Sequence, residues 1–191
     1  MTYVQTAKLT DDIITLEEVK QYIKVDFDDE DTLIQSLINA SVTIAEKWMN
    51  RDILTTTYFN YRDSFIQDLT LRRGGYQSVD LVEYLSDDVY TTLATTQYTV
   101  RIGGTFGIIC EIDPANHDDD CNAIRITFKT GFGDDATAVP SPIKDALLDI
   151  VSNLYQNRAS CADGAIPLQA QALLYYYRII DIVGAPGNVC V

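Results

Sequence analysis

The segment 113–121 gathers the residue types from which catalytic and metal sites are commonly made. It holds His117, the single histidine of the chain, together with four carboxylates and Cys121. Histidine beside carboxylates can serve as a general base or as a ligand of a divalent cation. The segment has, however, the composition of a polar hairpin tip between two strand-like stretches, and a loop is a poor mount for a catalytic group. We expect a solvated loop; a weak cation site and a hydrolase that uses His117 are the alternatives.

The run 26–31 is a second acidic cluster, with five carboxylates around Phe27. A calcium-binding loop requires a glycine at its sixth position and a glutamate at its twelfth, and this run lacks both. Carboxylates just before a helix can cap its free N–H groups and interact favourably with its dipole. The run therefore indicates a solvated helix cap and no metal site.

Other signatures of catalysis are missing from the sequence. There is no G-x-S-x-G motif, and the glycines between 103 and 107 precede strand-like residues, whereas a phosphate-binding loop precedes a helix. The cysteines fit no zinc-ligand spacing, and we expect them to be free thiols. These cysteines are Cys110, Cys121, Cys161 and Cys190. We predict that the chain is not an enzyme and binds neither cofactor nor metal.

The composition is that of one folded domain with a strong negative charge. The 191 residues are 47% hydrophobic and 22% charged, which excludes a disordered chain. No apolar run approaches the ~20 residues of a membrane span, and residues 1–5 do not resemble a signal peptide, so we expect a protein made in the cytoplasm. Fourteen basic against 28 acidic residues give a net charge of −14. This charge disfavours sequence-specific DNA binding; it serves either solubility or a surface past which DNA moves without sticking.

Helical patterns at both ends of the chain flank a centre rich in strand-forming residues. Thr15 and Glu18 form a capping box for a helix over about 15–24, and apolar residues recur at three-and-four spacing over about 31–50. Between 53 and 132, β-branched and aromatic residues with glycine turns predict five or six short antiparallel strands. The pattern predicts a single α+β domain, 1–191, in which an antiparallel β module is inserted into a helical bundle.

Two further helices follow the β module. Ser141 is expected to be the N-cap and Pro142 the first residue of a helix over about 141–158. Pro167 opens a fourth helix over about 167–182, which we expect to carry Tyr177 and Ile180 on its apolar face.

Tyrosines near the end of that helix are candidate contact residues. Tyr175, Tyr176 and Tyr177 are consecutive, so on a helix they point in three directions and at least one cannot face its own core. Tyrosine and arginine are enriched in protein interfaces. Tyr175, Tyr176 and Arg178 are therefore either ordinary surface residues of an amphipathic helix or a subunit contact.

The tail 184–191 is a second candidate. It begins with glycine and proline and then becomes apolar, with Val189 and Val191. Such a segment either frays or adds a strand to the sheet of a partner.

Taken in order, these patterns resemble those of the head–tail connector (head-completion or adaptor) proteins of tailed bacteriophages. The resemblance runs from about residue 13 to 180, and the segment 76–98 has no counterpart in it. The resembling pieces are the helix start Thr15-Leu16-Glu17-Glu18, the acidic run 28–31, the long helix 33–48, the glycine turn 130–133, the proline-led helix 139–158, and Pro167, Leu173-Leu174 and Tyr177-Arg178.

The resemblance implies a virion structural protein that forms a ring, expected to be a dodecamer, at the head–tail junction. The ring would dock on the portal protein, meet a downstream neck or tail protein, and extend the DNA channel without specific DNA binding and without a membrane. The acidic residues expected to line the channel are Asp26, Asp28, Asp29 and Glu30. Docking would order the tail 184–191 and so trigger oligomerisation.

Two other functions remain open. One is a different neck or tail component, such as a stopper or a tail terminator, although those proteins are mainly β. The other is an acidic DNA mimic that inhibits a nuclease, which requires carboxylates spaced like phosphates along one face.

Overall fold

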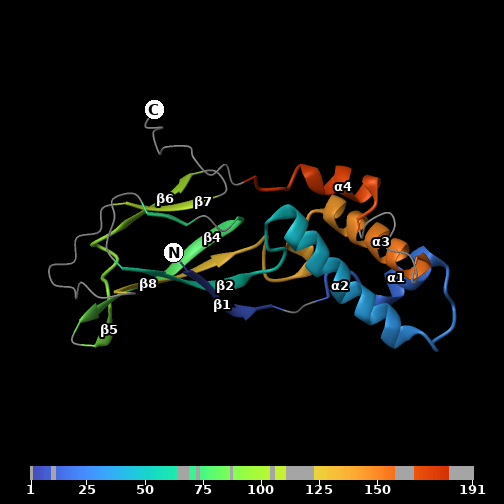
Figure 1. Ribbon diagram of the computed structural model, residues 1–191, viewed down its shortest axis with the longest axis horizontal. Helices are drawn as coiled ribbons and strands as arrows, with labels where there is room; N and C mark the ends of the chain where they lie inside the picture. The colour runs from blue at the N-terminus through green and yellow to red at the C-terminus, as the bar shows by residue number, and fades with distance from the viewer. Residues whose placement is uncertain are drawn as a thin grey trace.

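The computed structural model describes residues 2–9, 12–63, 69–71, 74–86, 88–103, 106–110, 123–157 and 166–180. Along the long axis of the molecule, a group of helices lies beside a group of strands (Figure 1). Two helices precede the main strand region and two follow it. The predicted α+β class, a helical bundle with an inserted antiparallel β module, is confirmed.

The helices are amphipathic segments with definite ends. They are α1 (Leu16–Ile23), α2 (Asp31–Met49), α3 (Ser141–Gln156) and α4 (Leu168–Tyr175). The capping box of α1 is present: the Glu18 N–H donates to Thr15 Oγ1 at 3.2 Å, and the Thr15 N–H donates to Glu18 Oε2 at 2.8 Å. Lys24 and Asn50 take left-handed backbone conformations and end α1 and α2. No described helix has both the length and the apolarity needed to cross a membrane.

Prolines cap both C-terminal helices, with a shift of one residue from the prediction for α3. Ser141, predicted to be the N-cap, is the first helical residue, and Pro140 is the cap. The reason is that the Pro140 carbonyl accepts the first hydrogen bond, from the Ile143 N–H at 3.0 Å. Pro167 caps α4 in the same extended backbone conformation.

The predicted end of α4 near residue 182 is wrong, because the helix ends at Tyr175. Tyr177 and Ile180 therefore lie beyond it. The Ile179 N–H donates to the Met49 carbonyl at 2.8 Å, and the Ile179 side chain is buried. This contact with the end of α2 draws the chain out of the helix and overrides the apolar pattern that continues past Tyr175.

The strands form two antiparallel sheets. The first has the order β1 (Thr2–Lys8), β2 (Thr56–Arg62), β8 (Ile124–Thr130), β4 (Tyr76–Ser86), β5 (Val89–Thr92). The second has the order β3 (Leu69–Leu71), β7 (Phe106–Cys110), β6 (Thr99–Gly103). The described part of the region 53–132 thus holds seven strands, more than the predicted five or six. β1 was not predicted, because it lies outside that region and is largely polar.

Each half of the molecule has its own core. In the helical half, Val19, Ile34 and Leu147 belong to one fully buried cluster. In the strand half, a second cluster joins the two sheets, with Phe128 of the first sheet and Ile109 of the second both fully buried. The helices are therefore held together by a core of their own, separate from the core of the sheets.

Candidate assembly surfaces

The acidic run 26–31 forms the turn between α1 and α2, at the end of the molecule away from the strands (Figure 1). Lys20 of α1 fixes this turn, since its Nζ lies 2.7 Å from Asp28 Oδ1 and 2.8 Å from Asp31 Oδ1. The hydrogen bond from Lys20 lowers the pKa of the Asp28 carboxyl below its ordinary value. The Tyr155 hydroxyl donates to Glu30 and ties the turn to α3. The turn is thus a fixed, charged surface.

The predicted channel residues differ in exposure. Asp26, Asp28 and Asp29 are exposed, whereas Glu30 is half-buried. Phe27 lies among them with 45% of its surface exposed. Within the described residues, no three His, Cys, Asp or Glu side chains are grouped so that they could hold a metal ion. The turn can present negative charge and one aromatic ring, and we assign it no chemistry.

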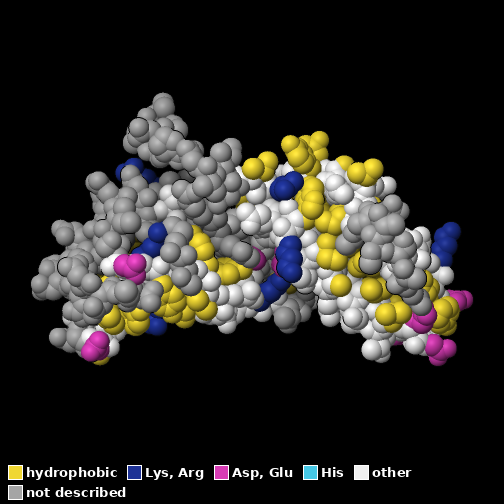
Figure 2. Space-filling view, in the orientation of Figure 1, with side chains coloured by type: hydrophobic (Ala, Val, Ile, Leu, Met, Phe, Trp, Pro, Cys, Tyr) yellow, Lys and Arg dark blue, Asp and Glu magenta, His cyan; other side chains and the backbone are white. Residues whose placement is uncertain are grey.

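An apolar stripe covers the outer side of α4 and the chain that follows it. Its members are Leu168, Tyr175, Tyr176 and Ile180, with exposed fractions of 82%, 60%, 87% and 62%. Figure 2 shows hydrophobic side chains gathered along this edge of the helical half. The opposite side of α4, with Ala170 and Leu174, is fully buried. A helix that is apolar on every side is normally covered on every side.

Two of the predicted contact residues, Tyr175 and Tyr176, thus lie in one surface. The third tyrosine, Tyr177, turns inward and packs edge-on against Phe132 with 5.8 Å between ring centroids. Arg178 is exposed, and its guanidinium lies 4.8 Å from the centre of the Trp48 ring. Stacking on an aromatic ring holds this guanidinium at a defined place beside the stripe.

Sequence reasoning missed Leu168 and Ile180 in this surface. Leu168 begins the helix and was assigned no role from the sequence, and Ile180 was expected on the apolar face of the helix. The available signal was the composition of α4, LQAQALLY, in which apolar residues occur on all sides.

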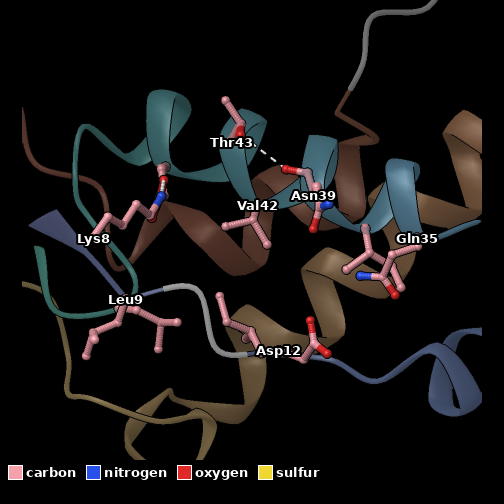
Figure 3. A pocket seen from close by; sticks show the side chains of 11 residues that line it. Lys8, Leu9, Asp12, Gln35, Asn39, Val42 and Thr43 are labelled. Carbon is pink, nitrogen blue, oxygen red and sulfur yellow. Dashed lines mark hydrogen bonds and ion pairs between the residues drawn. The ribbon is translucent and has the colours of Figure 1, made fainter.

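A groove of about 430 Å³ lies between α2 and the residues Lys8, Leu9, Asp12 and Ile13 (Figure 3). Leu9 and Val42 give it apolar walls, and Gln35 and Asn39 face it from α2. Lys8 pairs with Glu46 at one end. The described lining thus combines apolar and amide side chains with one ion pair, and we assign the groove no chemistry.

Several predicted residues lie outside the described part of the chain. These are the loop around His117, the tail residues Val189 and Val191, and the cysteines Cys121, Cys161 and Cys190.

Comparison with known proteins decides which family has this arrangement. The family model described as "Head completion protein" matches residues 12–179, from just before α1 to the residue that anchors the chain on Met49. The chain belongs to the head completion protein family. This family is structural and not enzymatic, which confirms the prediction that the chain is a virion structural protein and not an enzyme. The match leaves out β1.

Solved structures have the same fold as this head completion protein at low sequence identity. A chain from "Neck of empty GTA particle computed with C6 symmetry" superposes with a TM-score of 0.78 and 17% identity, over 97% of this chain and 99% of the other. A chain from "Virion of native gene transfer agent (GTA) particle" gives 0.76 and 17%, with the same coverage. A chain from "Neck of native GTA particle computed with C12 symmetry" gives 0.75 and 15%, again over 97% and 99%. A search of curated protein sequences gave no significant match.

Proposed function

We propose that this head completion protein is a head–tail connector that forms a twelve-fold ring in the neck of a tailed virion. In this role the ring docks on the portal protein and extends the DNA channel toward a downstream neck or tail protein. The observation that carries the proposal is the family match over residues 12–179, which includes all four described helices. The likeness in fold to chains from necks computed with C6 and with C12 symmetry supports a symmetric ring, and the C12 case agrees with the expected twelve copies.

The test of this role is co-sedimentation with purified portal rings. The chain is expected to travel with the portal at a ratio of one copy to one portal subunit. Binding to a tail-side protein alone, with bare portals, would instead support a stopper or a tail terminator. Tight binding to a nuclease with no portal binding would support the DNA-mimic alternative.

The acidic turn between α1 and α2 faces the DNA channel in this proposal. Asp26, Asp28 and Asp29 are exposed, and Lys20 neutralises only part of their charge. A ring of such turns repels DNA phosphates, so the passing genome is not gripped. Glu30, being half-buried and bonded to Tyr155, contributes less to this field.

Charge reversal tests the channel assignment. Asp26→Lys with Asp29→Lys is expected to make portal-bound rings retain DNA at low salt, and the retention should fall as salt rises. The control is Asp88→Lys, at an exposed residue between β4 and β5 at the opposite end of the molecule, compared with Asp29→Lys alone so that the change in charge is equal. Equal retention by Asp88→Lys and Asp29→Lys contradicts the assignment.

The segment 184–191 supplies a further contact with the portal. This part of the proposal comes from the sequence alone, in which Val189 and Val191 suit addition of a strand to a partner's sheet. Removal of 184–191 is expected to weaken portal binding about tenfold or more. Unchanged binding contradicts it.

A further inference from the structure

Large apolar side chains in the outer stripe of α4 are exposed to solvent to an unusual degree. Tyr176 is 87% exposed and Leu168 is 82% exposed, although both belong to a segment that is otherwise packed against the bundle. Over the described residues 166–180 the sequence contains one charged side chain, Arg178, and it is positive in a chain of net charge −14. The stripe is therefore an apolar ridge with a cation at one end.

A groove of about 440 Å³ lies between α1 and α3 and has the complementary character. The half-buried Leu148 supplies apolar surface above the buried Ile14, and Tyr22 projects with 46% of its surface exposed. Two exposed carboxylates, Glu18 and Asp145, also line this groove. Its remaining lining residues are Gln21, Ser141 and Lys144.

Tyr22 gives the groove a fixed shape. Its hydroxyl donates to Asp149 Oδ1 at 2.5 Å. This hydrogen bond holds the Tyr22 side chain of α1 against α3 and raises the pKa of Tyr22. The groove is thus preorganised to receive a side chain, and a preorganised surface loses little conformational entropy when it is filled.

The positions of ridge and groove suit a cyclic assembly. In a closed ring, each copy uses two different surfaces, one for the neighbour on each side. α3 packs against both α1 and α4, and the ridge on α4 shares no residue with the lining of the groove beside α1. They do not compete for space within one copy.

We infer that the α4 ridge of one copy docks in the α1–α3 groove of a second copy of this chain, with Tyr176 entering the groove and Arg178 meeting Asp145 or Glu18. The occupant is a second copy because Arg178 of the ridge is a cation, whereas the groove, with Glu18 and Asp145 against Lys144, is net negative, and because ridge and groove share no residue. This inference rests on the proposed ring, and it leaves the acidic turn 26–31 free to face the channel.

Site-specific photocross-linking tests the contact. Tyr176 is replaced by p-benzoylphenylalanine, a change that its high exposure makes safe for folding, and the protein is irradiated with portal rings present. Mass spectrometry is expected to find cross-links from Tyr176 to residues of α1 or the first turns of α3 in another copy. Cross-links to the portal or to a downstream protein alone would overturn the inference.

Imaging of the same sample tests the ring separately. Density beneath the portal without the copy-to-copy cross-link leaves the proposed function intact and contradicts only the contact between copies.

A charge exchange provides an independent test. Arg178→Glu and Asp145→Lys are each expected to weaken ring formation about tenfold, and the double variant should recover most of the loss. Since Arg178 stacks on Trp48, its variant is also compared with wild type by thermal denaturation, while Asp145 is exposed and its variant should fold normally. Additive losses in the double variant, with both folded, would contradict the pairing. A chain that forms no ring on the portal at all contradicts the proposed function, and the copy-to-copy contact falls with it.

Discussion

The buried carboxylate of Asp52 accepts a hydrogen bond from the hydroxyl of Thr130 at 2.7 Å, across 78 positions of sequence. Its other oxygen accepts from the Tyr58 hydroxyl at 2.9 Å. Asp52 follows α2, whereas Tyr58 and Thr130 belong to the adjacent strands β2 and β8. This carboxylate therefore fastens the helical half to the sheet at the point where the chain passes between them.

Replacement of Asp52 by alanine should destabilise the fold strongly. The hydroxyls of Tyr58 and Thr130 lose the buried carboxylate to which they donate, and we expect a loss of about 3 kcal/mol in the free energy of unfolding, measured by urea denaturation. Asp29→Ala, at an exposed carboxylate, is the control and should change stability by less than about 0.5 kcal/mol. Similar small effects in both variants would show that Asp52 does not join the two halves.

Gly131 should tolerate no side chain. Its φ is +120°, and a Cβ there would lie 2.6 Å from the Leu54 carbonyl oxygen, which is backbone and cannot move aside. We expect Gly131→Ala to cost more than about 2 kcal/mol in thermal or urea denaturation. Gly75→Ala is the comparison: its φ is +80°, but the nearest atom to a Cβ is Nε of the flexible Arg51 side chain at 2.9 Å. Gly131→Ala should lose more stability than Gly75→Ala, and the reverse order contradicts this account of the turn.

The titration of Asp28 should report its contact with Lys20. The hydrogen bond from Lys20 lowers the pKa of Asp28 from its ordinary value of 3.8, and the same contact raises the pKa of Lys20 above 10.5. The stabilisation from Asp28 is therefore present above pH 3.8 and is lost as the pH falls through the lowered value in the folded protein. The stabilisation from Lys20 is present below pH 10.5 and is lost as the pH rises through the raised pKa of Lys20 in the folded protein.

Carbon-13 NMR of the carboxyl groups can check this contact directly. In Lys20→Met the Asp28 titration midpoint should move up toward its ordinary value. Lys24→Met, which removes an exposed lysine of the same helix end, should leave the midpoint in place. A midpoint that is identical in all three proteins excludes the pairing.

Arg125 should be irreplaceable by lysine. Its Nε and Nη2 donate to the two oxygens of Glu83 at 2.7 and 2.8 Å, a planar fork that lysine cannot form. We expect Arg125→Lys to lose about 1 kcal/mol and Arg125→Met about 2 kcal/mol, since the Glu83 carboxylate is only 10% exposed. Lys129→Met removes the exposed pair with Asp80 on the same strand and should cost less than about 0.5 kcal/mol. Equal losses at both sites would contradict the role of the fork.

The helices were predictable because their signals are local. The capping box at Thr15 and the periodic apolar face of α2 depend on neighbours three and four residues away, and both are present in the structure. The end of α4 depends instead on the Ile179–Met49 hydrogen bond, whose partners are far apart in sequence. No local pattern carries that information.

For the strand half, the sequence predicted an antiparallel β module but neither β1 nor the number of strands. Alternating residues in β8 matched its burial pattern, whereas β1 gains its place by pairing with β2 and gives little signal of its own. The exposure of Tyr175 and Tyr176 could be expected, because consecutive tyrosines on a helix cannot all be buried; the role of these tyrosines and of Arg178 as contact residues stays a prediction. The groove beside α1 could not be found, since it exists only where α1 and α3 pack together.

Imaging of the protein mixed with its portal, without imposed symmetry, is the most direct test of the connector role. We predict a ring of added density on the tail-facing side of the portal, with twelve copies and an open central channel. Portal rings left bare while this protein stays monomeric would contradict the connector role.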